Sequence, residues 1–142
     1  MDDVACMGLA ERRAAKDFET FRFQSLKAAI DKAAGFEVAM EVDWDSLATE
    51  GQAHLYDDSW AKVYFRPLAE ALSQICRDDL GKEALQDGLK SIKVQNRSGC
   101  YNGDNWAHFS KGELVLDHEP CSNVDYVDER TNGLVTTLEA AL

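Results

Sequence analysis

The residue types that most often carry chemistry gather between Cys100 and Cys121. This stretch holds two cysteines, two histidines and several carboxylates. Thiolate and neutral imidazole are preferred zinc ligands, so one conceivable ligand set is Cys100, His108, His118 and Cys121. Their spacing matches no standard zinc finger or ribbon, and we therefore predict no metal site and no cofactor.

The same stretch could supply a nucleophile, since a cysteine beside a histidine is a common catalytic pair. Such a pair needs the thiol within hydrogen-bond reach of the imidazole and donors for an oxyanion, and the spacing indicates neither. The sequence also lacks a glycine-rich phosphate loop, a nucleophile elbow and a dinucleotide fingerprint. No catalytic residue is predicted, and the sequence disfavours an enzyme without excluding one.

The charge of the chain is strongly negative and unevenly distributed. Lys and Arg number 15 against 26 Asp and Glu, a net charge of -11. Half of these acids lie in two segments without a single Lys or Arg, residues 33–61 and 112–129. Such a field repels phosphate backbones and anionic membrane surfaces and attracts basic proteins. We expect no nucleic-acid or membrane partner, and a basic protein as a possible one.

Size and composition indicate one domain spanning residues 1–142, with residues 1–8 as a flexible N-terminus. A chain of 142 residues with 45% hydrophobic content can bury a real core. Asp2 and Asp3 stand where a secretory signal would carry positive charge, and no apolar run is long enough to cross a bilayer. Four cysteines without paired spacing indicate reduced thiols. These features predict a soluble, cytoplasmic protein.

Hydrophobic periodicity predicts three main helices. The first is a long helix over residues 9–34, whose apolar stripe includes Phe18 and Phe21 and which Gly35 closes. A central helix covers residues 67–80, with a break just before Pro67, and a short helix follows over residues 82–87. Residues 60–65 suit a helix or a strand, and helix is favoured. The last helix runs to the C-terminus.

Alternation predicts four strands. They cover residues 36–45, 89–97, 106–109 and 114–118, the last two forming a hairpin. If Phe109 stands opposite Glu113, then Trp106 and His108 share a face with Leu114 and Leu116, whereas a shift of one residue splits that set. The outward Lys93 and Arg97 could pair with the acidic face of the first strand. The fold class expected is α+β, a mainly antiparallel sheet with the three helices on one face.

Two functional hypotheses follow. The first is an acidic protein-binding module, such as an inhibitor or an antitoxin-like neutraliser of a basic partner. The second is a small enzyme or ligand-binding domain, its site formed by the connection over residues 46–58 and the hairpin region over residues 100–121. The residues expected to contact a partner or ligand lie on or beside that hairpin: Tyr101, Asp104, Trp106, His108 and His118.

Overall fold

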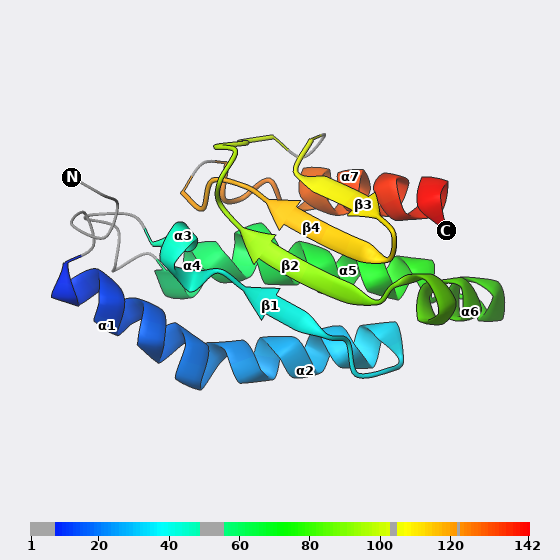
Figure 1. Cartoon of the computed structure of the whole chain (residues 1–142), viewed down its shortest axis with the longest axis horizontal. Coiled ribbons are helices and arrows are strands. Elements are labelled where there is room, and N and C mark those ends of the chain that lie inside the picture. The colour runs from blue at the N-terminus through cyan, green and yellow to red at the C-terminus, as the bar shows by residue number, and fades with distance from the viewer. Residues whose placement is uncertain (1–7, 49–55, 103–104, 122) are drawn as a thin grey trace.

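The protein is a two-layer α+β structure built on a four-stranded sheet (Figure 1). A computed structural model describes residues 8–48, 56–102, 105–121 and 123–142. Within these residues the strands run in the order β1-β2-β4-β3. Their bounds are Met40–Val42 for β1, Ser91–Gln95 for β2, Ala107–Ser110 for β3 and Glu113–Asp117 for β4.

The sheet is mixed, so the expectation of a mainly antiparallel sheet was wrong. Strand β2 runs parallel to both β1 and β4, and only the β3–β4 hairpin is antiparallel. Alternating burial is typical of antiparallel sheets because such sheets often have one wet face. Here β2 alternates in the same way although both of its neighbours are parallel, because helices cover one face of the sheet only. The alternating burial along β2 therefore indicates that one face of the sheet is open, and it does not indicate whether the neighbouring strands are parallel or antiparallel.

The long N-terminal helix is confirmed, with one irregularity. It consists of α1 (Leu9–Asp17), a π-helical turn η2 (Phe18–Arg22) and α2 (Phe23–Ala34). Gly35 closes it with φ of 85°, in the left-handed region. The wider π-helical turn shifts the phase of the following side chains. As a result Phe18 is buried while Phe21, expected in the same stripe, is 75% exposed.

The central helix begins before the expected residue 67 and ends at Ile75, earlier than the expected residue 80. It consists of α4 (Tyr56–Trp60), a π-helical turn η4 (Ala61–Phe65) and α5 (Arg66–Ile75), so the helical interpretation of residues 60–65 is confirmed. Pro67 lies in the first turn of α5, where its missing N–H is tolerated. In Figure 1, α5 lies behind the sheet, and it contacts α2 on one side and the C-terminal helix α7 (Val127–Ala141) on the other.

Two short helices complete the helix arrangement, which differs from the three-helix expectation. The first expected strand ends early because Asp43 caps the turn α3 (Trp44–Leu47) and accepts from the Ser46 N–H. The short helix after α5 is α6 (Asp79–Gly88), longer than expected because Asp78 caps it by accepting from the Gly81 N–H. It lies beyond the end of the sheet and not on its face (Figure 1).

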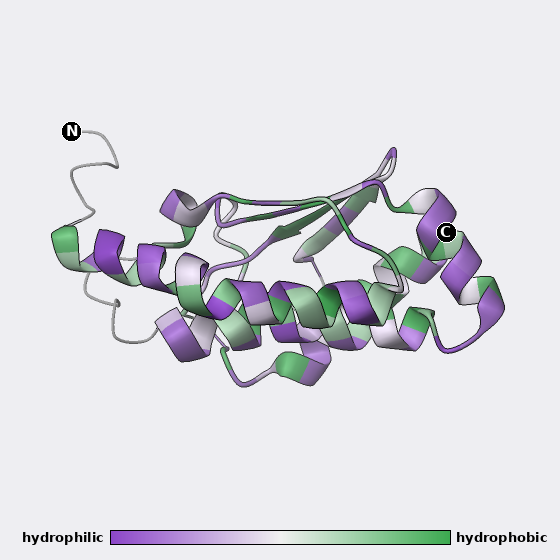
Figure 2. Ribbon diagram, turned by 90° about the horizontal axis from the view of Figure 1, so that it is seen from below, coloured by the Kyte–Doolittle hydropathy of each residue, from purple (hydrophilic) through white to green (hydrophobic). Residues whose placement is uncertain are grey.

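The core lies between the sheet and the helices. Ile92, Val94, Leu114 and Leu116 point from the strands toward the helices, where Leu68, Leu72, Leu134 and Leu138 are fully buried. Figure 2 shows the strands as one layer and the main helices as the other. In the part of the chain that the structure describes, no helix is both long and apolar enough to span a membrane.

Candidate binding surface and helix groove

The structure does not bring the expected site residues together. Tyr101 is 62% exposed, whereas Trp106 and His118 are completely buried. His108 is exposed on the sheet face that the helices leave uncovered. Asp104 lies outside the described residues. Two of the five residues, Tyr101 and His108, are described and exposed. Of these two, Tyr101 is the one joined to the loop before α7, through the hydrogen bond from Asn123.

The hairpin register separates the two histidines. Phe109 stands opposite Leu114, and Ser110 stands opposite Glu113. This is the register shifted by one residue, so His108 pairs with Val115 on the outer face while Leu114 and Leu116 point inward. His118 follows the end of β4 and turns into the interior. The two imidazoles therefore lie on opposite sides of the sheet.

His118 is a structural histidine of the core. Its Nδ1–H donates to the carbonyl of Glu119 at 2.6 Å, and its ring meets that of Trp106 edge-on at 6.0 Å. The Tyr64 hydroxyl donates to the His118 carbonyl. Burial lowers the pKa of His118, so the ring is held neutral. Among the described residues its Nε2 has no hydrogen-bond partner. A histidine enclosed in this way cannot reach a substrate or a partner.

The conceivable zinc ligands are described in full and do not converge. Within the described ranges, no group of three or more His, Cys, Asp or Glu side chains is placed to hold a metal ion. The alternative enzyme site is described only in part, because residues 49–55 of its connection and residues 103–104 of its hairpin region lie outside the described residues. Four cavities against the described residues are considered below, and neither His108 nor His118 lines any of them.

A buried arginine organises the loop before α7. Arg130 is 1% exposed, and its guanidinium donates to the carbonyls of Asn123 (2.7 Å), Val124 (2.7 Å) and Lys62 (3.2 Å). Burial lowers its pKa. Three carbonyls bound by one rigid fork tie the loop to the helix segment η4. Sequence reasoning missed this residue, since an arginine in the first turns of a helix normally lies on the surface.

That loop presents a surface that combines two tyrosines with acids. Tyr126 is 57% exposed, and the Tyr101 carbonyl accepts from the Asn123 side chain at 2.6 Å, which joins the two tyrosine-bearing segments. We call the tyrosine–acid surface the set formed by Tyr101, Asp125, Tyr126, Asp128 and Glu129, all of them exposed. Sequence reasoning missed Tyr126, because the hydrogen bond that joins its loop to the Tyr101 segment links residues 22 apart in the chain.

One lysine borders this surface. Lys62 pairs with Asp125 at 3.0 Å and with Asp58 at 3.3 Å, and these hydrogen bonds raise its pKa. A shallow cavity of 410 Å³ lies beside it, lined by Lys62, Arg66 and residues 125–129. Both carboxylates of these ion pairs are exposed, so water and salt screen their attraction to Lys62.

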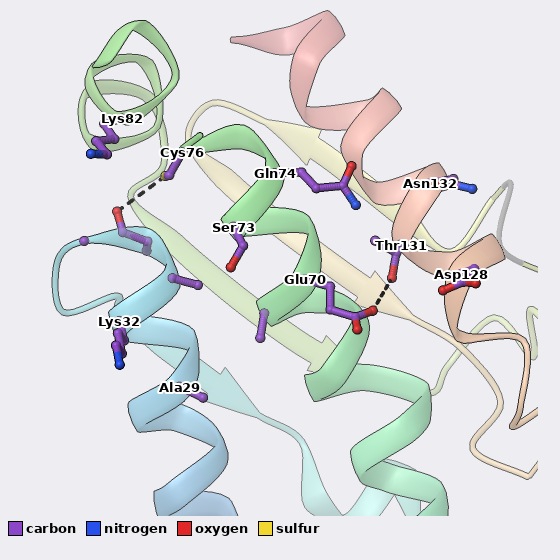
Figure 3. Close-up of a pocket in the computed structure, with 14 residues that line it drawn as sticks. Ala29, Lys32, Glu70, Ser73, Gln74, Cys76, Lys82, Asp128, Thr131 and Asn132 are labelled. Carbon is purple, nitrogen blue, oxygen red and sulfur yellow. Dashed lines mark hydrogen bonds between the residues drawn. The ribbon is translucent and has the colours of Figure 1, made fainter. Parts of the chain in front are cut away.

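The largest of the described hollows is a groove on the outer side of the helical layer (Figure 3). It has a volume of 1290 Å³, with α5 between α2 and α7. Lys32 and Lys82 stand on one side, and Glu70 and Asp128 on the other, where Glu70 accepts from Thr131. None of the expected site residues lines it.

The groove carries no catalytic pair. Its thiol, Cys76, donates to the Ala34 carbonyl at 3.6 Å, and burial raises the pKa of that thiol. A protonated thiol bound to the backbone is a poor nucleophile. Two smaller hollows remain, one of 590 Å³ between α1 and β1 with acids and bases in equal number, and one of 320 Å³ beside Phe21. Neither unites a nucleophile with a base.

Comparison of the chain with models of known protein families, with curated proteins and with solved structures found no match in any of the three.

Proposed function

We propose that this chain is an acidic binding module that docks a basic protein segment on the tyrosine–acid surface. The observation that carries the proposal is the buried Arg130, which fixes the loop of Asn123 and Val124 and so holds Tyr126 and its neighbouring acids in place. A surface fixed before binding loses less conformational entropy when a partner docks. Exposed tyrosines are frequent interface anchors, and surrounding carboxylates select a cationic partner.

The proposed module works by charge and by contact together. A net charge of -11 accelerates the encounter with a cationic protein, and it opposes binding to nucleic acid or to an anionic membrane. Once docked, arginine side chains of the partner would stack on Tyr101 and Tyr126 and pair with Asp128 and Glu129. This is the action expected of an inhibitor or neutraliser of a basic protein in the cytoplasm.

The test uses a nine-residue arginine peptide as the probe, titrated into the full chain while amide chemical shifts are followed by NMR. The expected shifts concentrate at residues 101 and 123–130. The double variant Asp128→Asn/Glu129→Gln should weaken the peptide's Kd about tenfold, and Tyr101→Ala/Tyr126→Ala by a similar factor.

A matched control separates a specific surface from bulk charge. Glu83→Gln/Asp87→Asn makes the same change in net charge on α6, where both residues are exposed. This control should change the Kd less than about twofold, since distant exposed charges are screened by salt. Equal weakening by both double variants, or shifts spread evenly over all acidic segments, would reject the proposal.

A further inference from the structure

The chain segments that leave β2 and β4 stay side by side after the two strands end. The His118 N–H donates to the Gln95 carbonyl at 3.2 Å, and the Glu119 N–H donates to the Cys100 carbonyl at 2.7 Å. Further on, the Asn123 side chain donates to the Tyr101 carbonyl at 2.6 Å. The two segments are thus joined at successive points beyond the sheet.

This pairing brackets two cysteines. Cys100 lies at the Glu119 contact, and Cys121 lies midway between Glu119 and Asn123, the two residues that bind the Cys100–Tyr101 segment. Hydrogen-bonded neighbouring segments lie about 5 Å apart, and a disulfide needs Cα atoms about 4.4–6.8 Å apart. Both side chains are half-buried thiols, so each has access to a small oxidant.

We propose that Cys100 and Cys121 form an oxidation site that closes to an intramolecular disulfide in the presence of a peroxide. One thiolate attacks the O–O bond of hydrogen peroxide, which yields a sulfenic acid and hydroxide. The second thiolate attacks the sulfenic sulfur and forms the S–S bond. The sulfenic oxygen leaves as hydroxide, and the two protons from the thiols convert both hydroxides to water. Two thiols and one peroxide therefore give one disulfide and two waters.

Cys76 provides an internal contrast. The Cys76 thiol donates to the Ala34 carbonyl at 3.6 Å, much as the Cys100 thiol donates to the Asn102 carbonyl at 3.4 Å, but burial raises the pKa of the Cys76 thiol. Because the thiolate is the form that reacts, Cys76 should react more slowly with peroxide.

The disulfide would also act on the tyrosine–acid surface, and this step depends on the proposed function. Cys100 precedes Tyr101, and Cys121 precedes the loop that Arg130 fixes. A covalent bond between them would hold Tyr101 at a constant position relative to Tyr126, which lowers the entropy lost on binding. Oxidation should therefore tighten binding of the basic segment.

The experiment treats the full chain with a small excess of hydrogen peroxide, blocks remaining thiols by alkylation and digests with trypsin without reductant. Cleavage after Arg97, Lys111 and Arg130 places the two cysteines on separate peptides, residues 98–111 and 112–130. The expected product is these two peptides linked through sulfur, with residue 76 alkylated. Cys76→Ser should give the same link, whereas Cys100→Ser and Cys121→Ser should each abolish it.

The outcomes distinguish this inference from the proposed function. Links that join either cysteine to Cys6 or Cys76, links between chains, or sulfinic acid without a link would overturn the oxidation site, whatever the arginine peptide does. If the link forms and the arginine peptide binds the oxidised chain at least threefold more tightly, both steps are supported. If the link forms and the Kd stays unchanged, the site stands and its effect on the surface is rejected.

Discussion

The two acidic segments look alike in the sequence and differ in the structure. Three described acids of residues 33–61 face bases supplied by other parts of the chain. Glu41 stands in register with Lys93, Asp43 forms an ion pair with Arg97, and Asp57 pairs with Arg22 at 2.7 Å. The predicted pairing is confirmed for Arg97, which binds Asp43, whereas Lys93 is shown only to stand in register with Glu41. Much of this segment's charge is answered within the fold.

The second acidic segment divides into an inner and an outer part. Asp117 is 8% exposed and accepts hydrogen bonds from Gln95, from the Arg97 N–H and from both the N–H and hydroxyl of Ser98. Asp125, Asp128 and Glu129 lie outside, next to Tyr126. A run of acids in sequence is therefore no measure of surface charge, because the fold decides which carboxylates meet bases, which turn inward and which stay exposed.

The largest expected effect tests whether Arg130 holds the outer part of the second segment. Arg130→Met keeps the apolar stem and removes the donors to three carbonyls, each worth about 1 kcal/mol or more when left unpaired. We expect the free energy of unfolding, measured by urea denaturation, to fall by about 3 kcal/mol. Arg77→Met, at an exposed position, should change it by less than about 0.5 kcal/mol. Equal stability of the two variants would show that the loop of Asn123 and Val124 keeps its conformation without the hydrogen bonds from Arg130.

A smaller effect compares one carboxylate from each segment. Asp117→Asn replaces a buried acceptor of several hydrogen bonds, and we expect a loss of about 1–2 kcal/mol in urea denaturation at pH 7. Asp43→Asn keeps a good helix cap and removes only the charge facing the exposed Arg97, so its loss should stay below about 1 kcal/mol. A larger loss of stability in Asp43→Asn than in Asp117→Asn would contradict the distinction between a buried carboxylate and a surface carboxylate paired with a base.

The smallest effect concerns His118, the buried histidine of the hairpin region. Burial lowers the pKa of His118 in the folded state, so its contribution to stability is complete above its unfolded pKa of about 6.5 and is lost as the pH falls below that value. The fall in stability between pH 7.5 and 5.5 should be smaller in His118→Gln than in the wild type. An unchanged pH dependence in His118→Gln would contradict the assignment of His118 to the core.

Helix positions and local chemistry were largely readable from the residues. The helix over residues 9–34, its closure at Gly35 and the C-terminal stripe of Val127, Leu134 and Leu138 follow from spacing and propensity, which act within a few residues. The inward Ile92 and Val94 of β2 are equally local. The expected strand over residues 36–45 was too long, because Asp43 favours a cap over continued extension.

The candidate site was mostly beyond the sequence. Tyr101 and Trp106 were both expected to contact a partner or ligand. Tyr101 is exposed, whereas Trp106 is buried, with its indole N–H donating to the Arg130 carbonyl at 3.0 Å. A large aromatic side chain is consistent with a core or an interface until its neighbours are known. His118 was misplaced for the same reason.

The amino-acid sequence by itself determined the elements, the alternation of the strands and the net charge, since these depend on residue type and short spacing. Tertiary structure alone decided the parallel pairing of β2, the one-residue register that separates His108 from His118, and the enclosure of Arg130. Each of these features depends on contacts between residues far apart in the chain. The packing of the sheet against its helices therefore decides which strand pairing, which register and which side-chain position is adopted.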